Sequence, residues 1–306
     1  GSGSSESSVG TNIWMERLVF RELFRAIRYE SAGWRVSRTL FANNGGAIAN
    51  LFAGGMDLDH CVFWSNGYAI AQVVAVPITV SNSVFVGGRS FVGGFNEEVP
   101  NMPQSGAYNI FWNTVIFSTN APLFLADLNL SNSTFANPEF ADPAALDFHP
   151  RSITGRFVAA TGTWTNDLVH SPLIDLGDPS RSVGLESAPN GGVINVGIYG
   201  GTAEASRSRT NAWLYALTYS DGGVMTRTGR LQWAYGGFPG SDLVRIDYST
   251  NNGLSWLVLA TNLVASNRTH SFSVTGLTST LLGRWRVVRQ ADTNVLSANV
   301  TNFALR

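Results

Sequence analysis

Candidate catalytic side chains gather in the first part of the chain, a few residues before phenylalanines that recur at regular spacing. Asp57 and Asp59 alternate along one predicted strand and would share its outward face, while Arg38 and His60 precede successive phenylalanines by the same three residues. Paired carboxylates can act as general acid and base in glycoside hydrolysis, and Arg38 or His60 could act as a base. The alternative is a set of cross-coil ion pairs on a solvated face, each contributing less than about 1 kcal/mol. Later coils carry Thr, Ser and Asn at these positions, which favours the alternative.

Two further residues could contact a ligand, and two more could bind a cation. Arg35 is expected directly beside Asp57 of the neighbouring coil, and an outward indole at Trp64 could stack on a sugar ring. Asp175 and Asp178 could bind Ca²⁺, the one cofactor that the sequence suggests. Aspartates at turns also cap backbone amides, and aromatic residues stack between coils, so a structural role is the alternative at each position.

The elements that must position these residues are repeats of about 22 residues, each built around a phenylalanine that ends a short β-prone run. These residues are Phe20, Phe41, Phe63, Phe85, Phe117 and Phe135, at spacings of 21, 22, 22, 32 and 18. Apolar residues recur five and seven positions before each phenylalanine and would share one face of a strand. Asn-Gly or Gly-Gly pairs follow three of them, where a tight turn would need left-handed backbone. The pattern predicts stacked coils of a parallel β-helix, with turn asparagines that could hydrogen-bond along its axis.

Two parts of this region allow another interpretation. Apolar residues within residues 14–29 also have helical spacing, so a capping helix is the alternative to a first coil. The long spacing before Phe117 predicts an insertion over residues 95–107 that leaves the solenoid as a loop. Such a loop could mark a working face or lack regular structure.

Composition excludes several classes of protein. Charged residues make up 13% of the 306 residues, against roughly 25% in an average domain. The net charge of −1 lacks the basic field with which proteins bind nucleic acid. We expect no membrane span, because no apolar run approaches the roughly 18 residues that one requires. A single Cys excludes a disulfide framework and multi-cysteine metal sites.

The segment after the repeats resembles part of a known family. The runs SPLIDLGDPS (171–180) and APNGGVINVGIYGGTAEAS (188–206) are similar to runs that close the solenoid in bacterial secreted right-handed parallel β-helix proteins of the pectin-lyase-like superfamily. Short alternating strands after residue 211 predict a β-sandwich, which resembles fibronectin-type or Ig-like modules. We therefore expect an all-β protein with a linker or artificial tail over residues 1–11, a right-handed parallel β-helix of about six coils with its closing segment over 12–206, and a small β-sandwich over 207–306.

The resemblance leaves two functions open. The first is a non-catalytic extracellular or cell-surface scaffold, similar to an adhesin, that contacts a polysaccharide or cell-surface glycan. The alternative is a polysaccharide lyase or glycoside hydrolase acting in a groove on the solenoid. The chain has no Lys, a base that lyases of this fold commonly use, and this absence favours the scaffold. The first coil would also present open strand edges, so we expect self-association or a partner at that end.

Overall fold

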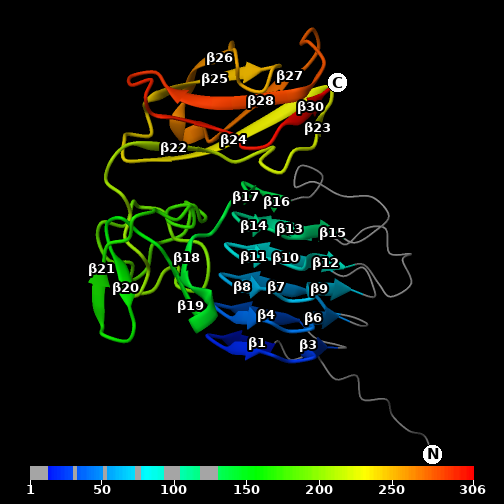
Figure 1. Ribbon diagram of the computed structural model, residues 1–306, viewed down its shortest axis with the longest axis vertical. Helices are drawn as coiled ribbons and strands as arrows, with labels where there is room; N and C mark the ends of the chain where they lie inside the picture. The colour runs from blue at the N-terminus through cyan, green and yellow to red at the C-terminus, as the bar shows by residue number, and fades with distance from the viewer. Residues whose placement is uncertain (1–12, 30–32, 51–53, 73–76, 93–103, 118–129) are drawn as a thin grey trace, which may run out of the picture.

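The computed structural model describes residues 13–29, 33–50, 54–72, 77–92, 104–117 and 130–306. Residues 13–135 form a parallel β-solenoid in which successive coils add strands to three parallel sheets (Figure 1). The chain passes through the first, second and third sheets in turn and then returns to the first sheet, one coil further along the axis. Every strand of the solenoid is therefore paired with its equivalents in the neighbouring coils.

The three parallel sheets have six, six and five strands among the described residues. The first sheet contains β1 (Ile13–Glu16), β4 (Trp34–Ser37), β7 (Met56–Asp59), β10 (Ile78–Ser81), β13 (Gln104–Ala107) and β16 (Leu130–Ser131). The second sheet contains β2 (Val19–Arg21), β5 (Leu40–Ala42), β8 (Val62–Trp64), β11 (Val84–Val86), β14 (Ile110–Trp112) and β17 (Thr134–Phe135). The third sheet contains β3 (Arg25–Tyr29), β6 (Gly46–Asn50), β9 (Tyr68–Gln72), β12 (Arg89–Val92) and β15 (Val115–Phe117).

Columns of similar side chains fill the interior, because equivalent residues of successive coils lie one strand spacing apart. The central column is a stack of phenylalanine rings from the second sheet. Its ring centroids are 5.3, 4.9, 4.7, 4.9 and 5.9 Å apart along the series Phe20, Phe41, Phe63, Phe85, Phe111 and Phe135. Such aromatic pairs contribute about 0.5–1.5 kcal/mol each beyond the area they bury. The stack is thus a continuous source of stability along the solenoid.

The structure confirms the repeat of about 22 residues over about four turns, and it corrects the later part of the predicted pattern. Phe85 is aligned with Phe111, not with Phe117. Phe117 belongs to the third sheet, where it is aligned with Phe91. The prediction was wrong because β15 ends, like the anchor strands, in a β-prone run closed by phenylalanine. Trp112, expected to point inward, is consequently exposed.

Three further details of the predicted pattern are corrected by the structure. In the third sheet Phe91 is aligned with Ile70, although Phe91 follows Phe85 by six residues and Ile70 follows Phe63 by seven, because the Gly-Gly turn before Phe91 is one residue shorter than the turn of the preceding coil. The predicted insertion cannot extend over residues 104–107, which form β13, and residues 93–103 lie outside the described part of the chain. The first coil forms β1, β2 and β3, so the alternative of a helix over residues 14–29 is wrong.

Two ladders of polar side chains satisfy the backbone at the turns. Between the second and third sheets, Asn66 Oδ1 accepts hydrogen bonds from Asn44 N and Nδ2 at 3.0 and 2.9 Å, and Asn66 Nδ2 donates to Phe41 O at 2.9 Å. Between the first and second sheets, the amide of Cys61 donates to Ser83 Oγ and the amide of Ser83 donates to Asn109 Oδ1, each at 3.0 Å. The predicted asparagine ladder is therefore present at the Asn-Gly turns.

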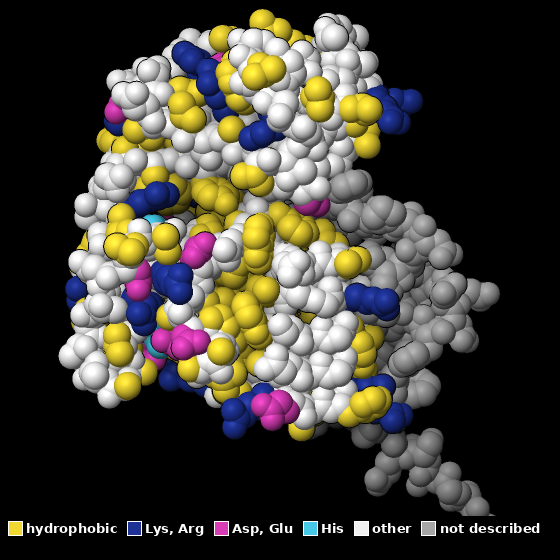
Figure 2. Space-filling model, in the orientation of Figure 1, with side chains coloured by type: hydrophobic (Ala, Val, Ile, Leu, Met, Phe, Trp, Pro, Cys, Tyr) yellow, Lys and Arg dark blue, Asp and Glu magenta, His cyan; other side chains and the backbone are white. Residues whose placement is uncertain are grey.

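The segment that follows the coils lies against the outer face of the second sheet. It contains β18 (Phe140–Asp142), β19 (Asp147–Pro150), β20 (Arg156–Val158) and β21 (Thr163–Thr165), and its remainder up to residue 210 has no long strand. Its Phe140, Phe148 and Leu173 share a core with outward residues of the second sheet such as Val62 and Val84. Figure 2 shows hydrophobic side chains gathered along the seam where this flanking segment meets the coils. The middle strands of the second sheet, β5, β8 and β11, are therefore largely buried on both faces.

Antiparallel and mixed sheets follow, and they cover the far end of the solenoid. One sheet contains β22 (Trp213–Ala216), β24 (Thr228–Gly236) and β27 (Thr269–Ser273), and the other contains β23 (Val224–Met225), β25 (Leu243–Ser249), β26 (Leu257–Val264), β28 (Thr280–Arg289), β29 (Leu296–Ala298) and β30 (Phe303–Leu305). Trp233 and Trp285 lie in their shared core. Ser220 Oγ accepts a hydrogen bond from Phe135 N at 2.9 Å, which satisfies an edge group of the last coil.

Helices contribute little to the fold. Those among the described residues are two 3-10 turns, η2 (Pro143–Ala145) and η3 (Ala265–Asn267). Within the same described ranges, no helix is long and apolar enough to cross a membrane.

The asparagine ladder yields a first prediction. Asn66→Ala removes a buried amide and leaves Asn44 N, Asn44 Nδ2 and Phe41 O without their partner. We expect the free energy of unfolding to fall by about 2–4 kcal/mol, because unsatisfied buried polar groups are costly. Urea unfolding followed by circular dichroism measures the change. The matched control Asn211→Ala, at an exposed position, should change it by less than about 0.5 kcal/mol, and an equal loss in both variants would contradict the role of the ladder.

Candidate functional site

The corner between the first and second parallel sheets brings together three of the charged residues singled out from the sequence, Arg38, Asp59 and His60. Its turns have one left-handed residue per coil, and Arg17, Arg38 and His60 occupy that position in the first three coils. Their common spacing before each phenylalanine therefore reflects a common backbone conformation. Because a left-handed residue directs its side chain away from the strand, these three side chains leave the solenoid at one corner.

Asp59 and His60 are buried beneath the flanking segment. Asp59 Oδ2 lies 2.6 Å from Arg181 Nη1, and Asp59 Oδ1 lies 2.9 Å from Asn82 Nδ2 and 3.1 Å from His60 Nδ1. His60 is fully buried against Gly200. Burial by itself would raise the pKa of the Asp59 carboxyl, but His60, Asn82 and Arg181 together hold that pKa well below its ordinary value. Asp59 is thus a buried carboxylate anion that ties the flanking segment to the third coil.

Arg35 and Asp57 lie near the starts of β4 and β7, away from this corner, and are open to solvent. Arg35 Nε is 3.5 Å from Asp57 Oδ2, and both side chains are about half exposed. The Arg35 guanidinium also lies 5.8 Å from the centre of the Trp14 ring. A shallow hollow of about 420 Å³ at this place is lined by these three residues and by Thr79 of the next coil. The expected cross-coil ion pair is present, whereas Asp57 and Asp59 do not converge on one cleft.

Trp64 points out of the solenoid and is partly buried by the flanking segment. Its ring makes edge contacts with Phe140 and Phe148 of the flanking segment, at centroid distances of 6.0 and 5.6 Å. The indole is therefore part of the core that joins this segment to the second sheet. The sequence could not show this contact, because the partners follow Trp64 by more than seventy residues.

Asp175 and Asp178 have separate contacts. Asp175 is buried and accepts a hydrogen bond from Ser208 Oγ at 2.6 Å, and burial raises its pKa to about 6. Asp178 Oδ1 accepts hydrogen bonds from Ser180 N and Oγ at 2.9 and 2.7 Å, as a turn cap does. Among the residues that the structure describes, no cluster of three or more His, Cys, Asp or Glu side chains could hold a metal ion.

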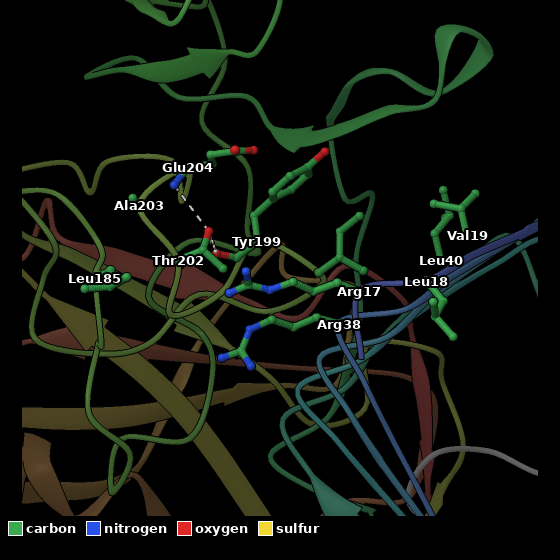
Figure 3. A pocket seen from close by; sticks show the side chains of 11 residues that line it. Arg17, Leu18, Val19, Arg38, Leu40, Leu185, Tyr199, Thr202, Ala203 and Glu204 are labelled. Atoms are coloured by element: carbon green, nitrogen blue, oxygen red, sulfur yellow. Dashed lines mark hydrogen bonds between the residues drawn. The ribbon is translucent and has the colours of Figure 1, made fainter. Parts of the chain in front are cut away.

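A pocket at this corner was not anticipated from the sequence. A half-open pocket of about 350 Å³ lies between the first two coils and the flanking segment. Its lining residues are Arg17, Leu18, Val19, Arg38, Leu40, Leu185, Ile198, Tyr199, Thr202, Ala203 and Glu204. Figure 3 shows the side chains of Arg17 and Arg38 extending side by side, with Tyr199 and Thr202 next to them and Leu18, Val19 and Leu40 at the opposite side. The pocket thus has a cationic part and an apolar part.

Hydrogen bonds and ring stacking position the polar residues of the pocket. Arg38 Nε donates to Gly200 O at 3.1 Å, and Arg38 Nη1 donates to Glu16 Oε1 at 3.2 Å. The Tyr199 ring stacks on the buried His149 ring, with centroids 3.6 Å apart. Burial, together with the carboxylates of Asp147 and Glu204, raises the pKa of the Tyr199 phenol well above its ordinary value. Tyr199 therefore stays protonated and can donate a hydrogen bond to a ligand.

A buried carboxyl group holds the loop that carries Tyr199. Glu186 Oε1 accepts hydrogen bonds from the amides of Asn195 and Gly201, each at 2.8 Å. Burial raises the pKa of Glu186 to about 7, and the neighbouring Asp175 adds to this effect while Arg38 opposes it. The glycine-rich run around Tyr199 is the signal that could have indicated a shaped loop, although it does not reveal what the loop contacts.

No protein-family model matches the chain, and no curated protein or solved structure matches it either. The chemistry of the pocket must therefore be inferred from its own residues. Two guanidinium groups and a protonated phenol can donate hydrogen bonds to an anion, whereas the Thr202 hydroxyl already donates to Tyr199 O at 2.7 Å. Glu204 is the one carboxylate among the described lining residues, so the lining holds no carboxylate pair.

The buried Glu186 carboxyl group, with its raised pKa, yields a prediction of pH dependence. Its folded-state pKa of about 7 lies above the ordinary 4.5, so the folded protein binds this proton more tightly than the unfolded chain does. The free energy of unfolding therefore falls as the pH rises from about 4.5 through 7. Glu186→Gln stays neutral and keeps an oxygen acceptor. We expect its free energy of unfolding to exceed that of the wild type by about 1–3 kcal/mol at pH 8, with a much smaller difference at pH 5.

Urea unfolding at the two pH values measures this effect. The control is Glu22→Gln, because Glu22 is exposed in the first coil and should show little change at either pH. A stability difference for Glu186→Gln that does not depend on pH would contradict the assignment.

Proposed function

We propose that this chain is a non-catalytic extracellular or cell-surface β-solenoid scaffold that binds an acidic glycan at the corner of its first two coils. The observation that carries the proposal is that the Arg17, Arg38 and Tyr199 side chains line one half-open pocket. A volume of about 350 Å³ suits one or two sugar rings. The ligand would therefore be a short stretch of a longer chain that leaves the pocket through its open side.

The lining favours a sugar that carries a carboxylate. Guanidinium groups bind carboxylates through paired hydrogen bonds, and they keep their charge at every physiological pH. Arg17 is only loosely placed against Glu16, at 4.0 Å, so its charge is available for a ligand. The apolar part of the pocket suits the C–H faces of a sugar ring, and the Tyr199 hydroxyl can donate a hydrogen bond to an oxygen of the sugar. A neutral glycan would bring no anionic group to the Arg17 and Arg38 guanidinium groups.

The ionisation states of the candidate catalytic groups support binding without catalysis. Asp59 is held as a buried anion and His60 is fully covered, so neither can reach a polysaccharide. Tyr199 is a poor general base, because its raised pKa disfavours the phenolate. Hydrolysis by general acid and base requires two carboxyl groups, and Glu204 has no such partner among the described lining residues.

The finer description of the fold belongs to the same proposal. We infer a right-handed solenoid of the pectin-lyase-like kind, followed by an Ig- or fibronectin-type sandwich that acts as a spacer. The closing-segment runs at residues 171–180 and 188–206 support the first part. The shared core of Trp233 and Trp285 between two sheets supports the second.

Binding measurements test the proposal. We expect isothermal titration calorimetry to detect oligogalacturonate and not a neutral glucan of the same length. Arg17→Ala should weaken the affinity at least about tenfold, because it removes one of the two cations that face the carboxylate. Arg89→Ala is the matched control, since Arg89 is also exposed but lies on the third sheet. Equal affinity for the neutral glucan, or equal losses in both variants, would overturn the proposed site.

A second assay separates binding from catalysis. Incubation with polyuronates should produce neither the ultraviolet absorbance of unsaturated uronates nor new reducing ends. A rise in either signal that is abolished by Tyr199→Phe would establish the alternative, a lyase or hydrolase acting in this pocket.

A further inference from the structure

The turn between the second and third sheets contains a column of glycines that the first coil interrupts. Gly45, Gly67 and Gly88 are equivalent in successive coils, as their backbone hydrogen bonds show. A Cβ atom at Gly45 would lie 2.7 Å from the Phe24 carbonyl oxygen, and one at Gly67 or Gly88 would clash with a carbonyl oxygen of the coil before it. A side chain at this position therefore points along the axis, into the place of the preceding coil.

The first coil has Phe24 at this position. Gly46 N donates to Phe24 O at 3.0 Å and Gly45 N donates to Leu23 O at 2.8 Å, which fixes the equivalence. The Phe24 side chain is therefore directed off the end of the solenoid, where it is 87% exposed. A further coil of the same geometry cannot stack on the first coil, because the Phe24 side chain occupies its place. The first coil is thus shaped as an end that presents an aromatic ring.

Other exposed apolar residues lie on both sides of β2 in the same coil. Leu18 and Val19 are exposed at its start, and Leu23 and Phe24 are exposed just after its end. The three strands of this coil are also the outer strands of their sheets in the described part of the chain, so their outer backbone groups are open for pairing. The far end differs, because Ser220 and Gln232 bind edge amides of the last coil there.

We propose that this end binds a second copy of the chain, head to head, about a two-fold axis through β2. Such an axis places Leu18 and Val19 of one copy against Leu23 and Phe24 of the other, so the apolar surface complements itself as an isologous interface requires. The axis also runs the two β2 strands antiparallel, a geometry in which open edges pair well.

A two-fold axis through β2 exchanges the first and third sheets, so β1 of one copy faces β3 of the other. β1 ends in Glu16, whereas β3 begins with Arg25, so this pair of opposite charges faces across the interface, while Arg21 at the end of β2 lies near the axis and close to Arg21 of the other copy. Continuing the solenoid head to tail would instead require the far end, which is already covered.

Sedimentation velocity over a wide range of protein concentration tests the interface. We expect the wild type to dimerise reversibly and Phe24→Lys to raise the dissociation constant at least about tenfold, because a charge replaces a central aromatic anchor. The matched control is Leu254→Lys, since Leu254 is equally exposed, at 87%, but lies in the turn between β25 and β26. Thermal melting should show that both variants fold as the wild type does. A wild type that stays monomeric throughout, or equal effects of the two variants, would overturn the proposal.

Cross-linking tests the symmetry. A short bis-maleimide should join Leu18→Cys to Phe24→Cys when the two variants are mixed, and it should not join Phe24→Cys to Leu254→Cys. The native Cys61 does not interfere because it is buried. A dimer that gives no Leu18–Phe24 product would overturn the proposed axis. Leu18 and Val19 also line the arginine pocket, so a dimer of this kind covers its apolar part, whereas Phe24 lies outside the pocket and Phe24→Lys tests the interface without changing the pocket lining.

Discussion

The fold depends on one constraint, the pairing of each coil with the next through parallel strands one strand spacing apart. Because equivalent residues stack on one another, a residue that suits one coil must also suit the same residue in its neighbours. The phenylalanine stack, the asparagine ladder and the glycine column all follow from this constraint. The same constraint explains why a single exception, Phe24, has consequences for the whole end of the solenoid.

Stacking organises the charged corner as well. The left-handed turn position repeats in every coil, so Arg17, Arg38 and His60 lie in one column although their environments differ. Arg17 is near the open end and accessible, Arg38 spans the pocket, and His60 is buried beneath Gly200. One backbone position thus supplies both a candidate ligand contact and a structural residue, according to how far the flanking segment covers each coil.

Predictions from the sequence were correct where they depended on residues close in the chain and failed where they depended on distant ones. The repeat, the inward strand faces and the turn asparagines were predicted correctly for the first coils, because each depends on residues about one coil apart. Phe117 was assigned to the wrong sheet because a short β-prone run ending in phenylalanine occurs in two different strands of the coil. A local pattern identifies a strand but does not say which side of the coil the strand forms.

By itself the sequence determined that the chain folds as stacked coils of about 22 residues, because a periodic apolar pattern can be buried only by repetition. The tertiary structure alone decided which charged residues are accessible. Asp59 pairs with Arg181, 122 residues later, and Arg38 binds the carbonyl group of Gly200, 162 residues later. No periodicity encodes such contacts, because they arise when a non-repeating segment covers the apolar outer face of one sheet. The physical reason is that burial, which sets both pKa and access, is a property of the packed surface rather than of the local sequence.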